Sequence, residues 1–570
     1  MVLVAALLAA LVVGRVAADR AQQGLTVWVA AAYISHGETT PRLSGRRPVL
    51  TPEGAQQLLR QGGAFRRRYL TPGSNSTIRN MSVDAIDSRH LFAMSSSDAW
   101  VASSAQAFIQ GLYPPRTGAV PGDLGRDYAT GNDSKDYPLG GYQYPLVQTL
   151  SSRDPYSVGL QGNVGCGSWQ WEMKNLFEKR RDIEARIEAT SGIYQALFES
   201  EPLQGVIPMA RVNYVNAVEV YDLVKYMYAH NETVFRKLGN ADEVLRVLNT
   251  LAYSSERDKT GYNGTAGDLK TTTFPGAHAT YSEVYSIAGR TLAGRFADRL
   301  IEAVASSGKR DKMTLMFGSS RPLVSFLSVA GLLTRQNLAS GPLSQMPGPG
   351  ASLVIEVVSD AAAAKQRAFP AAADLSVRFL YKPSADANES LTTYPLFGSG
   401  VDGTTVPYEA FLRRMREKGT TPLEWCDICL SHDSSHWCYP RSDLGSSGAT
   451  SVAVIAVLST LLVIVVFAFL GTVVCLKYPR AMKKTSPVAK PPSRSWWTRK
   501  GPSDADVVVS QSGVREVRTG SWEMGQGFRR TASNASGAGT VRNFSTPRAY
   551  MVDDDGDSLS GLPVRPRETI

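Results

Sequence analysis

Apolar runs and helical periodicities alternate along most of the chain. A continuous apolar run over residues 25–34 predicts a buried strand. Thr51 followed by Pro52 predicts a helix that begins at this pair, because threonine is a good N-cap and proline suits the first helical position. The same patterns predict further strands at 90–94, 313–318, 352–358 and 375–381, and further helices at 98–113, 281–305, 322–333 and 407–418. This alternation predicts an α/β fold without fixing the strand order.

Residues from about 131 to 270 differ from their surroundings. They show helical patterning, as at 172–190 and 215–228, with few strand signals. We therefore expect a helical insertion of about 131–270 that caps the sheet, and a core built from about 25–130 and 270–420.

Two apolar segments are typical of membrane targeting. Residues 1–18 contain an apolar run followed by the small residues Ala17 and Ala18, the pattern of a secretory signal peptide. Residues 452–476 carry no charge over 25 positions, which is long enough to span a bilayer with some tilt. We expect an ectodomain at 19–440, a linker at 441–451 and a transmembrane helix at 452–476.

The charges that follow the apolar segment fix the expected topology. Eight basic residues and no acidic one lie between 477 and 500. Under the positive-inside rule this side is cytoplasmic, so the ectodomain faces the lumen or the outside of a single-pass type I membrane protein. The tail that follows the span excludes a glycolipid anchor. The plasma membrane and the vacuole both fit this topology.

The net charge of +10 belongs mainly to the tail. Residues 477–570 contain 16 Lys and Arg against 9 Asp and Glu, and their Ser, Gly, Pro and Arg content predicts disorder. The basic part, together with Trp496 and Trp497, suits the anionic lipids of the inner leaflet. We therefore expect a membrane partner, and the charge does not indicate nucleic-acid binding.

Six N-x-Ser/Thr sequons lie on the expected lumenal side, which fits a glycosylated surface. They are Asn75, Asn80, Asn132, Asn231, Asn263 and Asn388. Two more, Asn534 and Asn543, lie in the tail and should stay unmodified in this topology.

The first strand is followed by the segment Ser35-His36-Gly37-Glu38-Thr39-Thr40-Pro41. It resembles the Arg-His-Gly-x-Arg-x-Pro signature of the histidine acid phosphatases, the phytase-like branch of the histidine phosphatase superfamily. Four later segments match this family in chain order: 50–54, 104–108, 111–114 and 141–146. The resemblance covers about 25–440 and indicates a degenerate, membrane-anchored member of the fungal type. It implies a three-layer α/β/α sandwich of the phosphoglycerate mutase-like kind, with an all-α insertion.

The resemblance also implies which residues would do the chemistry. In this family a histidine attacks the phosphoryl group, three arginines clamp the phosphate, and a late His-Asp pair supplies the proton. His36 keeps the nucleophile position, and the other five positions are substituted. Ser35, Thr39 and Trp100 stand at the arginine positions, and Ser319 and Ser320 stand at the His-Asp pair.

These substitutions lead us to expect a pseudophosphatase that acts as a binding, receptor or adaptor protein for an unknown extracellular or lumenal ligand. One alternative is an active acid phosphatase that forms a phosphohistidine at His36, with its clamp relocated to other arginines. The candidates nearby in sequence are Arg42, Arg46, Arg47 and Arg89. Another alternative is a structural glycoprotein whose tail carries the function. We expect no cofactor.

The cysteines favour disulfides over a metal site. The expected ectodomain contains four, Cys166, Cys426, Cys429 and Cys438, and it enters an oxidising compartment. We expect two disulfides with three possible pairings; the family's Trp-Cys-x-x-Cys motif, matched at 425–429, is a disulfide feature. A zinc site with His432 and His436 is the alternative.

Overall fold

Strand β1 (Leu25–Ser35) lies in the middle of a mixed sheet. The structure is a computed structural model, and it describes residues 24–118, 125, 126, 128–130, 135–260, 273–275, 279–360, 368–398, 404–430, 437 and 438. Within these residues, eight strands run in the order β3-β2-β4-β1-β5-β6-β7, and β8 pairs with β6. Their bounds are β2 (Leu91–Ser96), β3 (Val147–Leu150), β4 (Met313–Gly318), β5 (Ser352–Asp360), β6 (Ser376–Lys382), β7 (Thr392–Tyr394) and β8 (Thr405–Pro407).

The sheet is parallel on one side of β1 and antiparallel on the other. β1, β4, β2 and β3 pair in parallel, whereas β5 pairs with β1, and β6 with β5, in the antiparallel sense. The carboxyl ends of β1 and β4 and the start of β5 therefore meet at one edge of the sheet, where Ser35 lies opposite Gly318.

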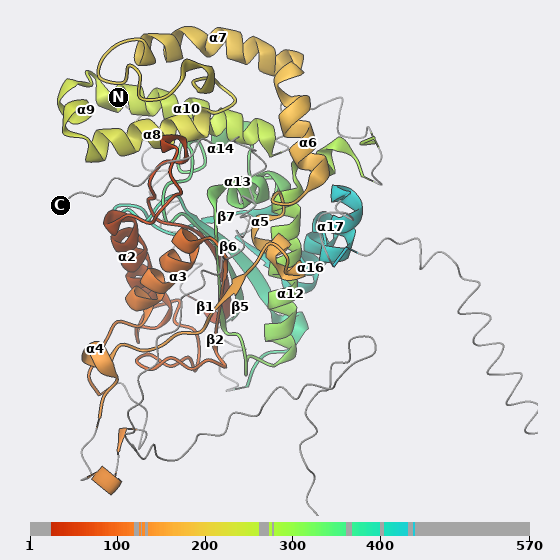
Figure 1. Ribbon diagram of the computed structural model, residues 1–570. Helices are drawn as coiled ribbons and strands as arrows, with labels where there is room; N and C mark the ends of the chain where they lie inside the picture. The colour runs from red at the N-terminus through yellow and green to blue at the C-terminus, as the bar shows by residue number, and fades with distance from the viewer. Residues whose placement is uncertain are drawn as a thin grey trace, which may run out of the picture. The chain divides into compact units, whose positions relative to one another are not determined.

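Both faces of the sheet are covered by helices. Alternate side chains of a strand point to opposite faces, and Ala30, Ala32 and Ile34 of β1 pack against α2 (Pro52–Tyr69) and α3 (Ala99–Leu112). Ala31 and Tyr33 face the other side, which is covered by α5 (Val158–Gln161), α12 (Ile287–Ala305), α13 (Ser320–Val329) and α16 (Tyr408–Lys418). Figure 1 shows α2 and α3 on one side of the sheet and α12 and α16 on the other.

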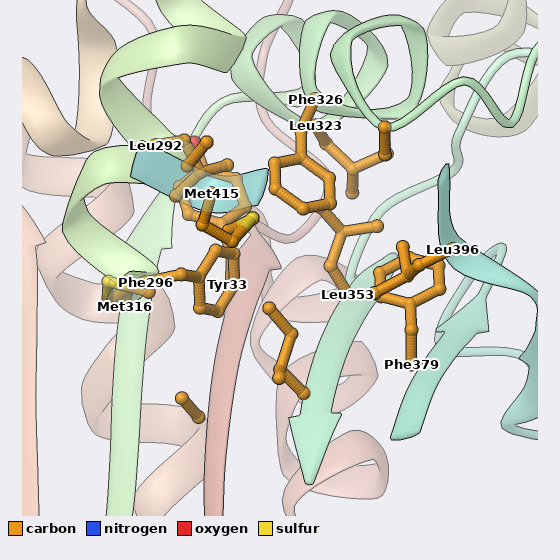
Figure 2. Packing of buried hydrophobic residues seen from close by; sticks show 14 of the residues in the cluster. Tyr33, Leu292, Phe296, Met316, Leu323, Phe326, Leu353, Phe379, Leu396 and Met415 are labelled. Atoms are coloured by element: carbon orange, nitrogen blue, oxygen red, sulfur yellow. The ribbon is translucent and has the colours of Figure 1, made fainter. Parts of the chain in front are cut away.

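The core on the second face is large and well packed. Figure 2 shows Tyr33 next to Phe296 and Met415, with Phe379 farther along the same cluster near Leu353 and Leu396. The Tyr33 hydroxyl reaches backbone carbonyls of Leu160 and Ser319, at 3.1 and 2.9 Å. The Tyr33 hydroxyl therefore connects the buried core to Ser319, in the loop that follows β4.

The helical insertion has a core of its own. Side chains such as Phe177, Tyr194, Leu223 and Leu248 bury one another there. The helices are α6 (Gly167–Asn175), α7 (Arg181–Phe198), α8 (Ala217–His230), α9 (Glu232–Lys237) and α10 (Ala241–Lys259). In Figure 1, α7 to α10 group together beyond one end of the sheet.

The last described helix, α17 (Pro422–Cys429), is fastened to the insertion by a disulfide. Cys166 pairs with Cys429, and Cys426 pairs with Cys438. Paired cysteines offer no thiolate to a metal ion. The remaining short helices are α4 (Pro138–Gly141), α11 (Tyr281–Tyr285) and α14 (Arg335–Ala339).

Most of the predicted elements are confirmed, and the differences have local causes. The helix expected at 172–190 is broken, because the chain leaves the helical conformation at Leu176 and Arg180. The helix expected at 281–305 is two helices that meet at Ser286. The sequence pattern missed β3, which lies within the expected helical insertion, and the three-residue strands β7 and β8.

Several expectations concern residues outside the described ones. These are the signal peptide, the segment 452–476, the tail, the sequons Asn132 and Asn263, and the histidines His432 and His436. The chain divides into two units, Met1–Leu458 and Ser459–Ile570, and the second lies wholly outside the described residues. No helix in the described part has the length and apolar character needed to cross a membrane.

Candidate functional site

His36 follows β1 at the edge where the strand ends meet. Its backbone N–H donates to the carbonyl of Gly318 on β4, at 3.0 Å, and its own carbonyl accepts from Gly350 ahead of β5, also a backbone bond, at 3.1 Å. The side chain is partly exposed. Two neighbouring strands therefore fix the backbone from which the imidazole projects.

A short hydrogen bond sets the tautomer of this imidazole. Nδ1 lies 2.7 Å from the carbonyl oxygen of Gly37. Because a carbonyl only accepts, we assign the proton of the neutral ring to Nδ1, which leaves Nε2 with a free lone pair. Burial lowers the pKa of His36, although the Gly37 carbonyl opposes it, so the ring is neutral at pH 7. This is the form a nucleophile requires.

The loop that carries His36 is pressed against the start of α2. A Cβ added to Gly37 would lie 2.2 Å from the carbonyl oxygen of Gly54, so a larger residue cannot fit without displacing the helix. The Gly37 N–H also donates to the hydroxyl of Ser104 on α3, at 3.1 Å. These two glycines and this serine together hold the loop in its position.

The loop opens into a cavity of about 180 Å³ between the sheet edge and the insertion. All six positions that the sequence assigned to phosphatase chemistry line this one cavity: Ser35, His36, Thr39, Trp100, Ser319 and Ser320. The structure therefore brings together residues that are up to 285 positions apart in the chain. The motifs therefore selected positions that lie together, and their chemical roles stay a prediction.

The side chains at three of these positions, Ser35, Thr39 and Trp100, are neutral. The Ser35 hydroxyl turns to the backbone and donates to the carbonyl of Gly348, at 3.2 Å. The indole of Trp100 is 8 % exposed and forms part of the wall. The guanidinium of Arg42 lies over this indole, 5.9 Å from the ring centre.

Helix α8 supplies a wall that the motifs did not predict. Glu219, Asp222 and Lys225 face the cavity at intervals of three residues, and Tyr221 and Tyr226 lie beside them. Such spacing places side chains on neighbouring positions of one helix face. This polar spacing within a helix whose other face is apolar was the signal that could have revealed the wall.

The two carboxylates of α8 have different acidities. Burial alone would raise the pKa of Glu219, but Lys259 and Arg321 outweigh it and hold the pKa below its usual value. Burial of the Asp222 carboxyl against the surrounding protein raises its pKa to about 7, with Lys225 partly opposing this shift. Glu219 is therefore charged at neutral pH, and Asp222 titrates there.

One ion pair and one hydrogen-bonded contact complete the polar lining of the cavity. Arg321 on α13 donates two hydrogen bonds to buried Glu256, at 2.6 and 3.1 Å, so its charge is neutralised. Glu38 contacts His230 of α8 at 2.8 Å and accepts from the Thr51 hydroxyl at 2.8 Å. The second contact joins the His36 loop to the insertion across the cavity mouth.

Of the four arginines considered as a relocated clamp, Arg42 lines the cavity, and the other three are not part of its wall. Arg89 instead pairs with Asp87 at 2.9 Å, just before the start of β2. Arg42 is placed by its neighbour Leu43, which packs against the core of the insertion. The lining thus carries Arg42, Lys225 and Arg321 against four carboxylates, those of Glu38, Glu219, Asp222 and Glu256.

The glycosylation sequons that the structure describes lie at the surface. Asn75, Asn80 and Asn388 are exposed. Asn231 is half-buried and is the N-cap of α9. Its side-chain oxygen accepts a hydrogen bond from the Val234 N–H, so this bond does not involve the amide nitrogen, the atom to which a glycan is attached.

Comparisons with known proteins agree with this fold. Residues 38–382 match the family model described as "Histidine phosphatase superfamily (branch 2)". Similar solved structures include the phytase of Klebsiella sp. ASR1 (12% identity, 70% of this chain and 96% of that chain, TM-score 0.46) and that of Citrobacter braakii (12%, 70% and 99%, TM-score 0.43). A third is the multiple inositol polyphosphate phosphatase of Bifidobacterium longum with inositol hexasulfate (12%, 70% and 94%, TM-score 0.40). Curated protein sequences give no significant match. Since the family model covers more than half of the chain, this protein belongs to the histidine phosphatase superfamily, branch 2.

Proposed function

We propose that this protein is a pseudophosphatase, whose cavity at His36 binds a ligand without hydrolysing a phosphomonoester. The protein would act as a receptor, adaptor or other binding protein. The observation that carries the proposal is the charge of the cavity wall, which bears more carboxylates than cations.

The physical reason is that phosphoryl transfer depends on positive charge. The protein does little covalent work beyond the nucleophile, so positioning and electrostatic stabilisation supply most of the catalysis. Each lost charge-assisted contact to phosphate removes about 1.5–3 kcal/mol. An arginine that acts in the transition state contributes about 10³-fold or more in rate. Three such positions are neutral here, at Ser35, Thr39 and Trp100.

The remaining cations do not replace the clamp. Arg321 is already paired with Glu256, and Lys225 and Arg42 share the cavity with Glu219 and Asp222. A phosphate dianion placed beside His36 would therefore meet two unpaired carboxylates as well as two cations. Ser319 and Ser320, at the position of the family's His-Asp pair, carry hydroxyl groups that can donate a hydrogen bond but are too weakly acidic to protonate a leaving group.

The sequence further supports a membrane display of this domain. The signal peptide at 1–18 and the uncharged segment 452–476 support a single-pass type I protein, with the ectodomain lumenal or outside. The basic segment after the span supports contact with anionic lipids of the inner leaflet.

An active acid phosphatase is the second candidate, and the orientation of His36 favours it. Nε2 is free to attack, and the N-termini of α3 and α13, which carry partial positive charge, lie beside the cavity at Trp100 and Ser320. In this reading Arg42 would be the one relocated clamp residue.

A hydrolysis assay separates the two candidates. The purified full chain is incubated with p-nitrophenyl phosphate over a range from acidic to neutral pH, beside a His36→Ala variant. The proposal predicts equal, background rates for both proteins. Turnover that depends on His36 would establish the second candidate instead.

A further inference from the structure

Four charged side chains of the cavity wall have no ion-pair partner among the described residues. They are the cations Arg42 and Lys225 and the carboxylates Glu219 and Asp222. The remaining charged side chains of the wall do have partners, as the pairs Glu256–Arg321 and Glu38–His230 show. The four side chains without an ion-pair partner are therefore two cations and two carboxylates.

Glu219 is the most constrained of these four. Its Oε2 atom is buried and makes no hydrogen bond within the described structure. Its charge persists at neutral pH, because nearby cations hold its pKa down. A buried polar atom without a partner costs free energy, and such atoms in native proteins usually have an explanation, such as a bound group.

The two cations are placed to contact a ligand as well. Arg42 is exposed, and among the described residues its guanidinium contacts only the face of Trp100, so its N–H donors remain available. The Lys225 ammonium lies 5.7 Å from the ring centre of Tyr221. Neither side chain is neutralised by a carboxylate within ion-pair distance in the described structure.

We infer that the cavity binds a small zwitterion, with a cationic group held by Glu219 and Asp222 and an anionic group held by Arg42 and Lys225. This inference rests on the proposed function, because it takes the cavity as a binding site that does not hydrolyse. A zwitterion can place a group of opposite charge in direct contact with all four side chains, whereas a phosphomonoester or a simple amine does so for two and repels the other two.

The size of the cavity limits the ligand. A cavity of 180 Å³ holds several water molecules, which suits a small ligand. Trp100, Tyr221 and Tyr226 add aromatic surface, which suits a short aliphatic chain and a cation near a ring face. A short amino acid fits these requirements.

The inference is tested by calorimetric titration of the full chain with matched ligands. Glycine, 4-aminobutyrate and 6-aminohexanoate present the two charges at increasing separations. Butylamine and butyrate present one charge each, and myo-inositol presents none. We expect at least one amino acid to bind tenfold or more tightly than both singly charged ligands and inositol.

Four variants locate the contacts. Glu219→Gln and Arg42→Gln should each weaken binding of the preferred amino acid roughly ten- to hundredfold, the worth of one charge-assisted contact. The matched controls Glu232→Gln and Arg46→Gln change carboxylate and guanidinium groups outside the cavity wall and should leave binding unchanged. Thermal unfolding of each variant verifies that it folds; if Glu219→Gln does not, Asp222→Asn takes its place.

Three outcomes would overturn the inference: no amino acid binds, inositol or a singly charged ligand binds as tightly, or Glu219→Gln and Arg42→Gln bind like their controls. None of these outcomes says whether the cavity hydrolyses a phosphomonoester. The hydrolysis assay with His36→Ala alone decides the proposed function, so the two failures are distinguishable.

Discussion

The orientation of the His36 imidazole is set by backbone groups. The Gly37 carbonyl fixes Nδ1, and the pairing of β1 with β4 fixes the peptide before the ring. The charge that would activate a phosphate belongs to side chains instead, and these can change without altering the strands. This explains how the site can preserve its shape while Ser35, Thr39 and Trp100 are neutral.

Asp222 should make ligand binding depend on pH near neutrality. Its pKa is about 7 in the free protein, and the groups that face it are Glu219, Glu256, Lys225 and Arg42. An ammonium group favours the ionised carboxylate, so the pKa falls on binding. Amino-acid affinity should therefore be highest above pH 7 and decrease by up to about tenfold per pH unit below it. Titrations at several pH values measure this change.

A control isolates the contribution of this carboxyl group. The side chain of the Asp222→Asn variant cannot ionise. The affinity of this variant for the amino acid should therefore be lower than that of the wild type and nearly constant over the same pH range. A wild-type affinity that rises as the pH falls would contradict the assignment.

Gly37 should tolerate no side chain. In Gly37→Ala the new Cβ would lie 2.2 Å from the Gly54 carbonyl, and the loop or α2 must move. Overpacking of this kind costs about 1–3 kcal/mol, occasionally more. Urea unfolding should show this loss of stability.

The matched control is Gly192→Ala, in the exposed part of α7 where a Cβ meets nothing within 4 Å. It should be neutral or stabilise the protein by up to about 1 kcal/mol. Equal stability of the two variants would show that the contact between Gly37 and Gly54 is not tight.

Sequence motifs predicted the floor of the cavity and missed its far wall. Ser35, His36 and Trp100 lie in or beside segments with a recognisable pattern, so their positions followed from local sequence. The spacing of Glu219 and Asp222 marks a polar face of α8, but no local pattern says what that face meets, because the contact forms only when the insertion folds over the sheet edge.

At the scale of elements, a buried charge cluster fastens α2 to the sheet. Glu356 of β5 is fully buried; it accepts from Arg68 and Tyr69 of α2 and from Arg378 of β6, at 2.7–3.0 Å. Burial alone would raise the pKa of Glu356, but the two guanidinium groups outweigh it and lower the pKa. The cluster therefore stays ionised and satisfied inside the core.

Replacing this carboxylate should destabilise the whole fold. Glu356→Gln leaves Arg378 buried without its counter-charge, a change worth about 3–5 kcal/mol. The control Glu53→Gln removes an exposed partner of Arg60 and should cost no more than about 1 kcal/mol. Chemical denaturation of both variants measures the difference.

The lowered pKa also predicts the acid dependence of stability. The folded pKa of Glu356 lies below its unfolded value of about 4.3. The stabilisation of the folded state by Glu356 is therefore complete above the unfolded pKa, and it is lost as the pH falls through the folded pKa. Glu356→Gln should have a shallower loss of stability in acid than the wild type; parallel curves would contradict the assignment.

The elements themselves followed from the sequence where the apolar pattern was strong. β4 has the predicted bounds, 313–318, because it is buried on both faces and reads as one apolar run. β3 was missed because it is an edge strand of four residues with two exposed side chains, which leaves little apolar signal. The strand order and the disulfide pairing depend on contacts between distant segments.

For the whole molecule, the expected topology makes a prediction about glycosylation. Peptide-N-glycosidase treatment of the protein from its native host should increase its electrophoretic mobility. Asn75→Gln, Asn80→Gln and Asn388→Gln should each remove one glycan, because these side chains are exposed. Asn534→Gln and Asn543→Gln should change nothing, since the tail is expected on the cytoplasmic side. A glycan at either tail position would contradict the type I topology.

The central claim is that the cavity at His36 does not turn over phosphomonoesters, and a single-turnover experiment tests it most directly. The full chain, in excess over a labelled phosphomonoester at about pH 5, is followed until even one slow event per molecule would be detected. We predict phosphate release no greater than that of His36→Ala. Stoichiometric release by the wild type, absent in His36→Ala, would contradict the account.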